Sequence, residues 1–412
     1  MTLRGRAALG AGAAARWASR VTGRGAGAMI GGLVAMTLDR SILRQLGAGR
    51  RIALVTGTNG KSTTTGMLAA ALRTLGAVAT NSEGANMDAG LVAALAADRD
   101  AALAALEVDE MHVPHIADAV EPVAVVLLNL SRDQLDRVGE INHIERTLRS
   151  GLAGHPRTAI VANCDDVLMT SAAYDCPNVV WVAAGAGWSN DSVSCPRSGE
   201  LIVRGGRDGT DWHSTGTDFR RPAPHWWFDD EKIYGPDGLI LPMRLALPGA
   251  VNRGNAAQAV AAAVAMGADP SAAVAAVSGV DEVAGRYRTV RIGDHSARLL
   301  LAKNPAGWQE ALSMVDKTAA GVVISVNGQV PDGEDLSWLW DVRFEHFEGT
   351  SVVAAGERGT DLAVRLGYAE VAHTLVHDTV AAIESCPPGH VEVLANYTAF
   401  LQLQRALARH RG

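Results

Sequence analysis

Residues 51–63 read RIALVTGTNGKST, a short apolar run that passes through a glycine loop into a helical pattern. The run 51–57 has the composition of a buried strand, and STTTGMLAAALRTLG at 62–76 predicts a helix that stops at Gly76. A glycine loop between a strand and a helix aims successive backbone N–H groups at an anion, and the helix N-terminus adds a favourable dipole. The stretch therefore predicts a phosphate cradle at the head of a parallel-sheet nucleotide-binding domain.

The loop GTNGKST, residues 57–63, has the residue types that bind ATP together with Mg²⁺. Lys61 would reach the β- and γ-phosphates, and the hydroxyl of Ser62, with Thr63 close by, would coordinate Mg²⁺. The predicted nucleotide-binding residues of the loop are Gly57, Thr58, Asn59, Gly60, Lys61, Ser62 and Thr63. ATP and Mg²⁺ are the expected cofactors, and a glycine turn that merely caps a helix is the plain alternative.

Length and composition exclude several classes of protein. A chain of 412 residues is long enough for two or three domains that bury their cores without metal or disulfide staples. Acidic residues outnumber basic ones by 44 to 37 and no long Lys/Arg stripe occurs, so no nucleic acid partner is expected. The four cysteines are scattered without repeated pairs, which favours a reducing cytoplasm over a disulfide framework.

The first fifty residues are rich in Ala, Gly and Arg and contain the apolar stretch 26–38. Gly31 and Gly32 interrupt this stretch, which is also short for a bilayer span, so no transmembrane helix is predicted. A signal peptide is the alternative, but no convincing cleavage site follows the apolar run. We expect a small helical lead-in over residues 1–50.

Further apolar runs extend the α/β pattern along the chain. Helix-like or polar segments separate four of them, at 103–108, 123–130, 158–164 and 179–185, which predicts a mostly parallel sheet. Short β-like runs between 192 and 247 predict inserted hairpins, an Ala-rich helix follows at 252–266, and a second, smaller α/β pattern begins near residue 285. The expected domains are 1–50, 51–284 and 285–412.

The glycine spacing of the loop departs from the usual phosphate-loop pattern, because position 55 is Val and the nearest glycine is Gly57. In this form GTNGKST resembles the loop of the Mur ligase and folylpolyglutamate synthase superfamily. The resemblance implies a Mur ligase-type central domain with a β-hairpin insertion, followed by a smaller Rossmann-like α/β domain. It also implies that a carboxylate is activated as an acyl phosphate before a nitrogen nucleophile attacks it.

The same resemblance implies where magnesium ligands lie. In LEVDEMHVP (106–114), Glu107 matches the superfamily's metal-binding Glu at a strand end, and Glu110 is the second choice. In NLSRDQLDR (129–137), Gln134 stands where the superfamily has a metal-binding His. An amide oxygen is a weaker ligand, so a tightly held second metal is not expected. The segment 143–151 has Arg149 and no Lys where the superfamily carries a carbamylated lysine.

Four further residues are expected around the nucleotide and the reacting carboxylate. By the resemblance, Asn255 in PGAVNRGNAAQAV (248–260) contacts the base and Arg286 in GRYRTV (285–290) reaches the γ-phosphate. Lys303 in AKNPAG (302–307) follows a predicted strand, where its charge would stabilise an acyl phosphate. Asn304 would orient the substrate. A helix cap at Asn252 and surface positions for the two cations are the plain alternatives.

Four C-terminal segments and the short stretch before the phosphate loop resemble the MurT family, the ligase-like subunits of lipid II isoglutaminyl synthases. These segments are 299–312, 327–345, 354–371 and 391–404. The resemblance implies ATP-dependent amidation of the α-carboxylate of D-isoglutamate in the lipid II stem peptide. It also implies a GatD-type glutaminase partner that delivers ammonia, and at most peripheral contact with the inner face of the plasma membrane.

Residues 332–341 pack acids and two tryptophans into one short segment, a density that favours an interface or active-site loop. The MurT resemblance implies that this loop faces GatD and that an Asp completes the partner's Cys/His site. Asp335 and Asp341 both remain candidates. Alternatively, Trp338 and Trp340 are packing residues and the acids are caps.

Many MurT-like chains carry a four-cysteine zinc ribbon, but here CPRSG offers only Cys195, with Ser198 where a second ligand would fall. Four-coordinate structural zinc needs four ligands, so no zinc is expected. Two other functions stay open: a stand-alone ligase similar to folylpolyglutamate synthase, and a non-catalytic ATP-binding scaffold.

Overall fold

The computed structural model describes residues 1–21, 28–81, 85–132, 140–206, 210–281, 287–333, 335–347 and 352–410. The chain divides into two compact units. One comprises Met1–Ser131 and Gly139–Asp281, and the other comprises Arg132–Val138 and Glu282–Gly412. The expected division into three domains, at residues 50 and 284, stays a prediction.

The chain begins with three helices, α1 (Leu3–Val21), α2 (Ala28–Leu38) and α3 (Ile42–Gly47). The first two pack closely because glycines face each other: a Cβ on Gly12 would lie 2.5 Å from the backbone oxygen of Gly31. A Cβ on Gly32 would lie even closer, 2.0 Å from the backbone oxygen of Ala89, which leaves no room for a side chain there. Among the described helices, none combines the length and the apolar character that crossing a membrane requires.

The first unit is built on a six-stranded sheet in the order β2-β3-β1-β4-β5-β6, and every pair in it is parallel. The strands are β1 (Arg51–Thr56), β2 (Val78–Thr80), β3 (Leu103–Glu107), β4 (Ala124–Leu127), β5 (Ala159–Asn163) and β6 (Val179–Val182). The predicted mostly parallel sheet is confirmed. The short edge strand β2 was not predicted, because three residues carry no periodic pattern.

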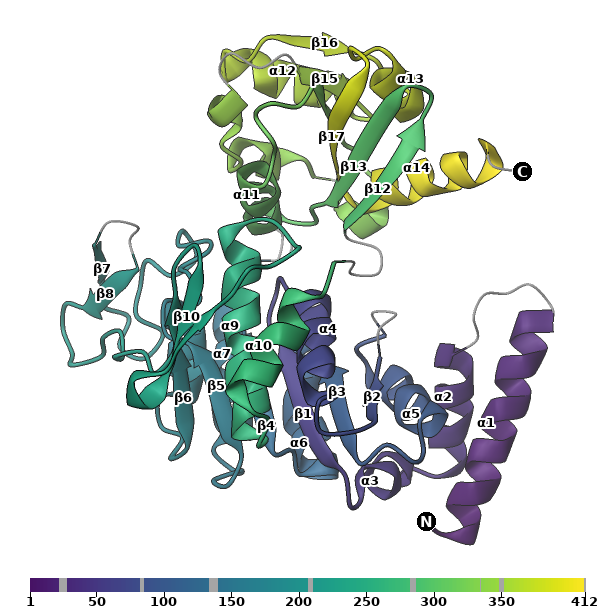
Figure 1. Cartoon of the computed structure of the whole chain (residues 1–412), viewed down its shortest axis with the longest axis vertical. Coiled ribbons are helices and arrows are strands. Elements are labelled where there is room, and N and C mark those ends of the chain that lie inside the picture. Colours follow the sequence, from purple (N-terminus) through teal and green to yellow (C-terminus); the bar gives the residue numbers. More distant parts are fainter. Residues whose placement is uncertain are drawn as a thin grey trace. The chain divides into compact units, whose positions relative to one another are not determined.

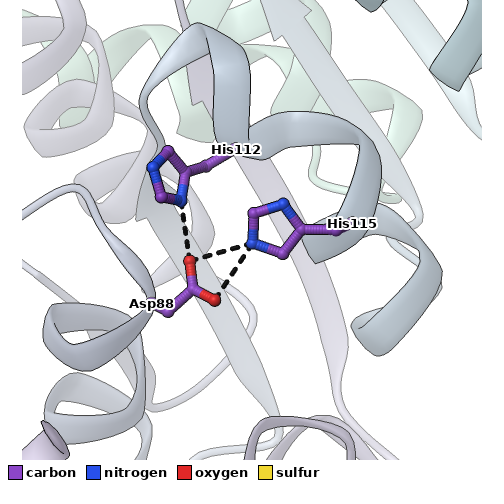
Figure 2. A group of neighbouring side chains, drawn as sticks. All are labelled: Asp88, His112 and His115. Carbon is purple, nitrogen blue, oxygen red and sulfur yellow. Dashed lines mark hydrogen bonds and ion pairs between the residues drawn. The ribbon is translucent and has the colours of Figure 1, made fainter.

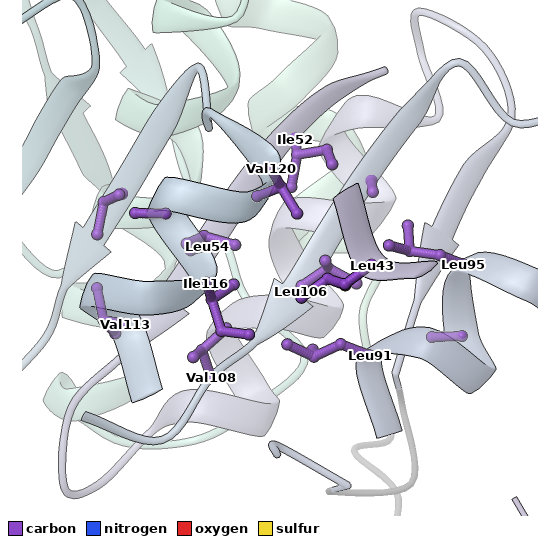
Figure 3. Packing of buried hydrophobic residues seen from close by; sticks show 14 of the residues in the cluster. Leu43, Ile52, Leu54, Leu91, Leu95, Leu106, Val108, Val113, Ile116 and Val120 are labelled. Carbon is purple, nitrogen blue, oxygen red and sulfur yellow. The ribbon is translucent and has the colours of Figure 1, made fainter. Parts of the chain in front are cut away.

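Helices cover the sheet, and the alternation of side chains along each strand divides the core between its faces. α4 (Lys61–Leu72), α9 (Ala250–Ala265) and α10 (Pro270–Ser278) pack together over one face (Figure 1). On the other face, Ile52, Leu54 and Leu106 meet side chains of α3, α5 (Asp88–Ala97) and α6 (Val113–Val120), as Figure 3 shows. α7 (Glu140–Leu152) and α8 (Val167–Ala173) extend the same core.

The segment between β6 and α9 forms small antiparallel sheets, which confirms the predicted β-hairpin insertion. Their strands are β7 (Ile202–Gly205), β8 (Asp211–Ser214), β9 (Trp227–Phe228), β10 (Lys232–Tyr234) and β11 (Ile240–Pro242). Cys195 lies with Trp212 and Phe219 in a small apolar cluster here.

The second unit holds a six-stranded sheet in the order β12-β13-β17-β14-β15-β16, parallel except at its first pair. Its strands are β12 (Tyr287–Ile292), β13 (His295–Leu301), β14 (Gly321–Ser325), β15 (Val352–Ala355), β16 (His373–Leu375) and β17 (Gly389–Ala395). Its helices are α11 (Pro305–Ser313), α12 (Gly359–Tyr368), α13 (Thr379–Glu384) and α14 (Tyr397–His410). The expected Rossmann-like α/β unit is confirmed. The sequence did not predict β16 or the antiparallel edge strand β12.

One buried ion pair links adjacent strands of this second sheet. The carboxylate of Glu392 on β17 is fully buried and lies 2.6 Å from Arg298 Nη2 on β13. His390 Nε2 lies 2.9 Å from the same carboxylate. Removing one partner of a buried pair leaves an uncompensated charge, whereas an exposed pair contributes little.

We expect Arg298→Met to destabilise β13 and β17 by about 3 kcal/mol, because the buried Glu392 carboxylate loses its guanidinium. Hydrogen exchange of the amides in these two strands, followed by mass spectrometry, measures the loss. Arg358→Met is the matched control, since its partner Asp361 is about half exposed and the expected change is below about 1 kcal/mol. Equal protection in the two variants would contradict the prediction.

Candidate functional site

The glycine loop lies between β1 and the N-terminus of α4, and two of its positions accept only glycine. Gly57 has φ 141° and Gly60, the N-cap of α4, has φ 84°, a region that side chains rarely adopt. A Cβ on Gly57 would lie 2.8 Å from Leu128 Cβ, and one on Gly60 would lie 2.8 Å from Asn255 Oδ1. The residues after β4 and the start of α9 therefore contact the loop on two sides.

The side chain of Asn129, just after β4, holds the backbone of the loop. Its Oδ1 accepts a hydrogen bond from the Asn59 N–H at 3.0 Å, and its Nδ2 donates to the Asn59 carbonyl at 3.0 Å. The Thr58 N–H donates to the Asn129 carbonyl at 2.8 Å. Thr58 Oγ1 also exchanges two hydrogen bonds of 3.0 Å with the backbone of Ser131. The loop is thus fixed to the carboxyl end of β4.

Lys61 is buried beneath the loop. Its Nζ donates to the Gly57 carbonyl at 2.5 Å and lies 3.3 Å from Glu110 Oε1. Burial raises the pKa of the Glu110 carboxyl above its ordinary value, against the opposing effect of Lys61. Glu110 begins the 3-10 turn η1 (Glu110–His112), and it is not a solvated loop acid.

Ser62 and Glu107, two predicted magnesium ligands, are in contact. Ser62 Oγ donates to Glu107 Oε2 at 2.7 Å, and Glu107 is only 3% exposed. Asn81, after β2, fixes the end of β3: its Oδ1 accepts from the Glu107 N–H and its Nδ2 donates to the Glu107 carbonyl, both at 2.8 Å. A hydroxyl and a buried carboxylate supply the hard oxygen donors that Mg²⁺ prefers, so these residues fit that ion.

The start of α9 lies against the loop, although its cap differs from the expected one. The N-cap is Gly249, and Asn252 lies inside the helix, where its Nδ2 donates to the Pro248 carbonyl at 2.6 Å. Asn255 is buried against Gly60. Its predicted contact with an adenine base stays a prediction.

Two predicted site residues, Gln134 and Arg286, lie outside the described residues, so the structure does not place them. In the second unit, Lys303 lies two residues after the end of β13, and its Nζ lies over the ring of Tyr397 at 5.1 Å from the centroid. Asn304 is buried as the N-cap of α11, where its Oδ1 accepts from the Gly307 N–H at 2.8 Å. The roles expected of them, stabilising an acyl phosphate for Lys303 and orienting the substrate for Asn304, stay predictions.

The acidic, tryptophan-rich loop 332–341 divides its side chains between interior and surface. Trp338 is buried and stacks on Trp308 with the ring centroids 5.5 Å apart. Trp340 is 56% exposed and meets Tyr368 edge to face at 5.2 Å. The interpretation of the tryptophans as packing residues therefore holds for Trp338, whereas Trp340 leaves a large aromatic ring on the surface.

The acids of this loop differ in the same way. Asp332 accepts a hydrogen bond from the Thr398 N–H at 3.0 Å, so it caps α14. Asp335 is exposed, with Oδ1 accepting from the Ser337 N–H at 2.8 Å, and Asp341 is half-buried. The buried Arg365 supports the loop by donating to the carbonyls of Leu339 and Val342 at 3.1 and 2.8 Å. Asp335 and Asp341 both stay predicted partners of the glutaminase.

Sequence reasoning missed the residues that position the site rather than bind its ligands. Asn129 was noticed only as the first residue of a motif, and Asn81 and Ser131 were not singled out. All three follow buried strands of the sheet directly or within a few residues, at the edge where its carboxyl ends meet. A polar residue at such a position is the signal that could have identified them.

Comparisons with known proteins agree with the fold of the two units. The model of the Mur ligase middle domain matches residues 55–263, and that of the MurT ligase C-terminal domain matches residues 301–400. The MurT subunit of the lipid II isoglutaminyl synthase (glutamine-hydrolysing) of Streptococcus pneumoniae is 29% identical, over 93% of each chain. The Staphylococcus aureus subunit of the same name is 27% identical, over 96% of each chain.

Among solved structures, a pseudomurein peptide ligase type C from Methanothermus fervidus superposes with a TM-score of 0.69 at 17% identity. The superposition covers 90% of this chain and 81% of that one, so the two share a fold. The expected Mur ligase fold and the resemblance to MurT subunits are both confirmed. Since the middle-domain model alone matches just over half of the 412 residues, the chain belongs to the Mur ligase family.

Proposed function

We propose that this chain is the activating subunit of a two-subunit amidating enzyme, and that it uses ATP to amidate the α-carboxylate of D-isoglutamate in the lipid II stem peptide. The observation that carries the proposal is the loop in which Lys61 and the Ser62–Glu107 pair meet at the N-terminus of α4, in a backbone conformation with positive φ at Gly57 and Gly60. The names of the two bacterial relatives support the substrate.

In the proposed reaction, a carboxylate oxygen of the stem peptide attacks the γ-phosphorus of ATP, and the bond to the β-phosphate oxygen breaks to release ADP. Ammonia then attacks the carbonyl carbon of the acyl phosphate, phosphate leaves, and the nitrogen loses a proton to give the amide. Mg²⁺, when bound, would neutralise charge on the β- and γ-phosphates. In this chain, Ser62 and Glu107 would hold the ion, and Lys61 would exchange its contact with the Gly57 carbonyl for a phosphate oxygen.

Ammonia is proposed to come from a GatD-type glutaminase, because no cysteine of this chain suits the hydrolysis of glutamine. A thiolate is the reactive form of cysteine, and burial raises the pKa of the thiols of Cys164, Cys176 and Cys386. Against the effect of burial, hydrogen bonds from Ser198, the backbone and Ser214 lower the pKa of the Cys195 thiol. Cys195 is nevertheless only 2% exposed and lies in the small apolar cluster with Trp212, out of reach of a substrate. Glutamine hydrolysis then requires a nucleophile from another polypeptide.

The loop 332–341 is proposed to face that partner. Exposed aromatic rings are favoured at interfaces, and Trp340 belongs to the same loop as the exposed Asp335 and the half-buried Asp341. One of the two carboxylates would orient the partner's catalytic histidine and stabilise its protonated form. Since lipid II is a membrane-bound substrate, the enzyme is proposed to act in the cytoplasm at the inner face of the plasma membrane.

Replacing the loop lysine tests the activating step. With a GatD-type partner, ATP, Mg²⁺ and lipid II, we expect Lys61→Met to lower amidation at least about a hundredfold with glutamine and with ammonia alike, because both routes need the phosphoryl transfer. Mass spectrometry of the stem peptide measures the product. Lys232→Met, at an exposed lysine, is the matched control and should leave the rate unchanged.

The wild-type chain supplies the outcomes that would contradict the function. Release of ADP that depends on added glutamate without any partner would identify a stand-alone ligase. ATP binding without turnover, while the partner still releases ammonia, would identify a scaffold.

Replacing the loop acids tests the contact with the glutaminase. We expect either Asp335→Asn or Asp341→Asn to lower glutamine-dependent amidation at least about tenfold and to leave ammonia-dependent amidation unchanged, because a lost triad carboxylate affects only the partner's histidine. The ratio of the two rates is the readout. Asp294→Asn, at an exposed acid of the same unit, is the control. A proportional loss of both rates, or no loss in either variant, would contradict the assignment.

A further inference from the structure

Two histidines and an aspartate lie together on the first unit, in a group to which neither the fold nor the proposed reaction assigns a role. Asp88 is the first residue of α5, His112 ends η1 and precedes α6, and His115 lies in the first turn of α6. Figure 2 shows both imidazole rings directed at the Asp88 carboxylate. His112 Nδ1 lies 2.8 Å from Asp88 Oδ1, and His115 Nε2 lies 2.9 Å from the same oxygen.

We propose that Asp88, His112 and His115 form a binding site for a divalent transition metal of the Zn²⁺ class. Two neutral imidazole nitrogens and one carboxylate oxygen are a donor set that such ions bind at about 2.0–2.2 Å. One ligand atom from each of the three residues can be chosen so that all lie within 4.8 Å of one another. Ligand atoms around a tetrahedral ion lie about 3.3 Å apart, so small side-chain rotations accommodate it.

The backbone around the three side chains is held in place without a metal. The Asp109 N–H donates to the Asn86 carbonyl at 3.0 Å, which joins the segment before α5 to the turn before α6. Gly90 packs so closely on Ala85 that an added Cβ would lie 2.1 Å from the Ala85 carbonyl oxygen. The two segments that supply the ligands are thus fixed against each other.

The exposure of the group suits a site with an open position. The side chains of Asp88, His112 and His115 are 24%, 31% and 51% exposed, so an ion and its water can enter from solvent. Nitrogen donors also distinguish this site from the oxygen pair of Ser62 and Glu107, which suits Mg²⁺. Excess Mg²⁺ should therefore not compete for it.

The position of the site gives it a structural consequence. His112 and Glu110 are the two ends of the same three-residue turn, and Glu110 contacts Lys61. An ion that joins Asp88 to His112 would restrain this turn. It would thereby restrain Glu110, which pairs with Lys61 of the phosphate loop. Metal binding here does not depend on the proposed amidation reaction.

Calorimetric titration of the full-length chain with ZnCl₂, without nucleotide and with excess Mg²⁺, tests the proposal. We expect one equivalent of Zn²⁺ to bind. His112→Asn or His115→Asn should weaken binding at least about tenfold, because even the loss of a residue that only supports a metal ligand costs about that much affinity. His155→Asn is the matched control, since His155 pairs with Asp118 at 3.1 Å without a second histidine in that ion pair.

Co²⁺ supplies a second readout that does not depend on stability. The visible absorption of bound Co²⁺ should indicate four- or five-coordinate binding in the wild type and in His155→Asn. The same bands should lose intensity in His115→Asn. His115 is about half exposed, so this substitution should not disturb the fold. No saturable binding at micromolar Zn²⁺, unchanged binding in both histidine variants, or full competition by Mg²⁺ would overturn the proposal.

A second inference rests on a separate observation, the outer face of α1. Positions spaced by three and four residues along the helix share one face, and here they are all exposed and small or apolar. They are Leu3, Ala7, Gly10, Ala14, Trp17 and Val21. Leu3, Trp17 and Val21 are 84%, 69% and 66% exposed, and on α2 Leu33 is 54% exposed.

The positive charge of residues 1–38 indicates which kind of surface this face would bind. Residues 1–38 contain five arginines and no Asp, Glu or Lys, although the whole chain has a net charge of −7. We infer that α1 and α2 dock on an anionic lipid surface, with the apolar face at the acyl boundary and the exposed Arg4 and Arg6 among the headgroups. A second copy of the chain is a poorer partner, because like charges would face each other.

Flotation with vesicles tests this docking. With full-length chain, we expect at least about fivefold more bound protein on equal parts of phosphatidylglycerol and phosphatidylcholine than on pure phosphatidylcholine, since each arginine near such a surface contributes about 1 kcal/mol. Trp17→Ser should lower the bound fraction, whereas Trp227→Ser, at a 42% exposed tryptophan in the insertion, should not. Equal binding to both vesicles, unchanged binding of Trp17→Ser, or a dimer that Trp17→Ser dissociates would overturn the inference.

Discussion

The reciprocal hydrogen bonds between the Asn129 side chain and the backbone of Asn59 are the contact on which the phosphate loop depends. They join the loop after β1 to the end of β4, a separate strand of the same sheet. Because a side-chain amide offers both a donor and an acceptor, it pairs with a peptide group as a neighbouring strand would. The loop conformation, with positive φ at Gly57 and Gly60, is thereby fixed before any ligand binds.

Much of the fold and part of the site could be predicted from the sequence, for reasons that differ between elements. The apolar run before GTNGKST and the glycines within it have strong local signals, so β1, the loop and α4 were predicted together. The phosphate-loop pattern identified Ser62 and the superfamily resemblance identified Glu107 as magnesium ligands, and the rule that ligands bind at the carboxyl ends of parallel strands agreed with the position of Glu107. The structure brings these two side chains within 2.7 Å.

The features that could not be predicted depend on contacts between distant segments. Nothing in the local pattern around Glu110 shows that its carboxyl is buried against Lys61, because that burial is produced by the packing of η1 on the loop. The triad of Asp88, His112 and His115 brings together two segments that are more than twenty residues apart. The antiparallel pairing of β12 with β13 likewise depends on register and not on composition. The roles of Gln134 and Arg286 stay predictions that rest on the family resemblance.

The strand order of the first sheet has a consequence for how the chain folds during synthesis. β1 pairs with β3 and β4 and has no neighbour that is adjacent in sequence, so this central strand lacks its first partner until residue 107 has been made and its second until residue 127. At about 5–20 residues per second, roughly 4–14 s pass between the appearance of β1 and that of its second partner. Until then at least one edge of the apolar segment Ile52–Val55 has no partner strand, and such transiently exposed apolar edges are prone to aggregation.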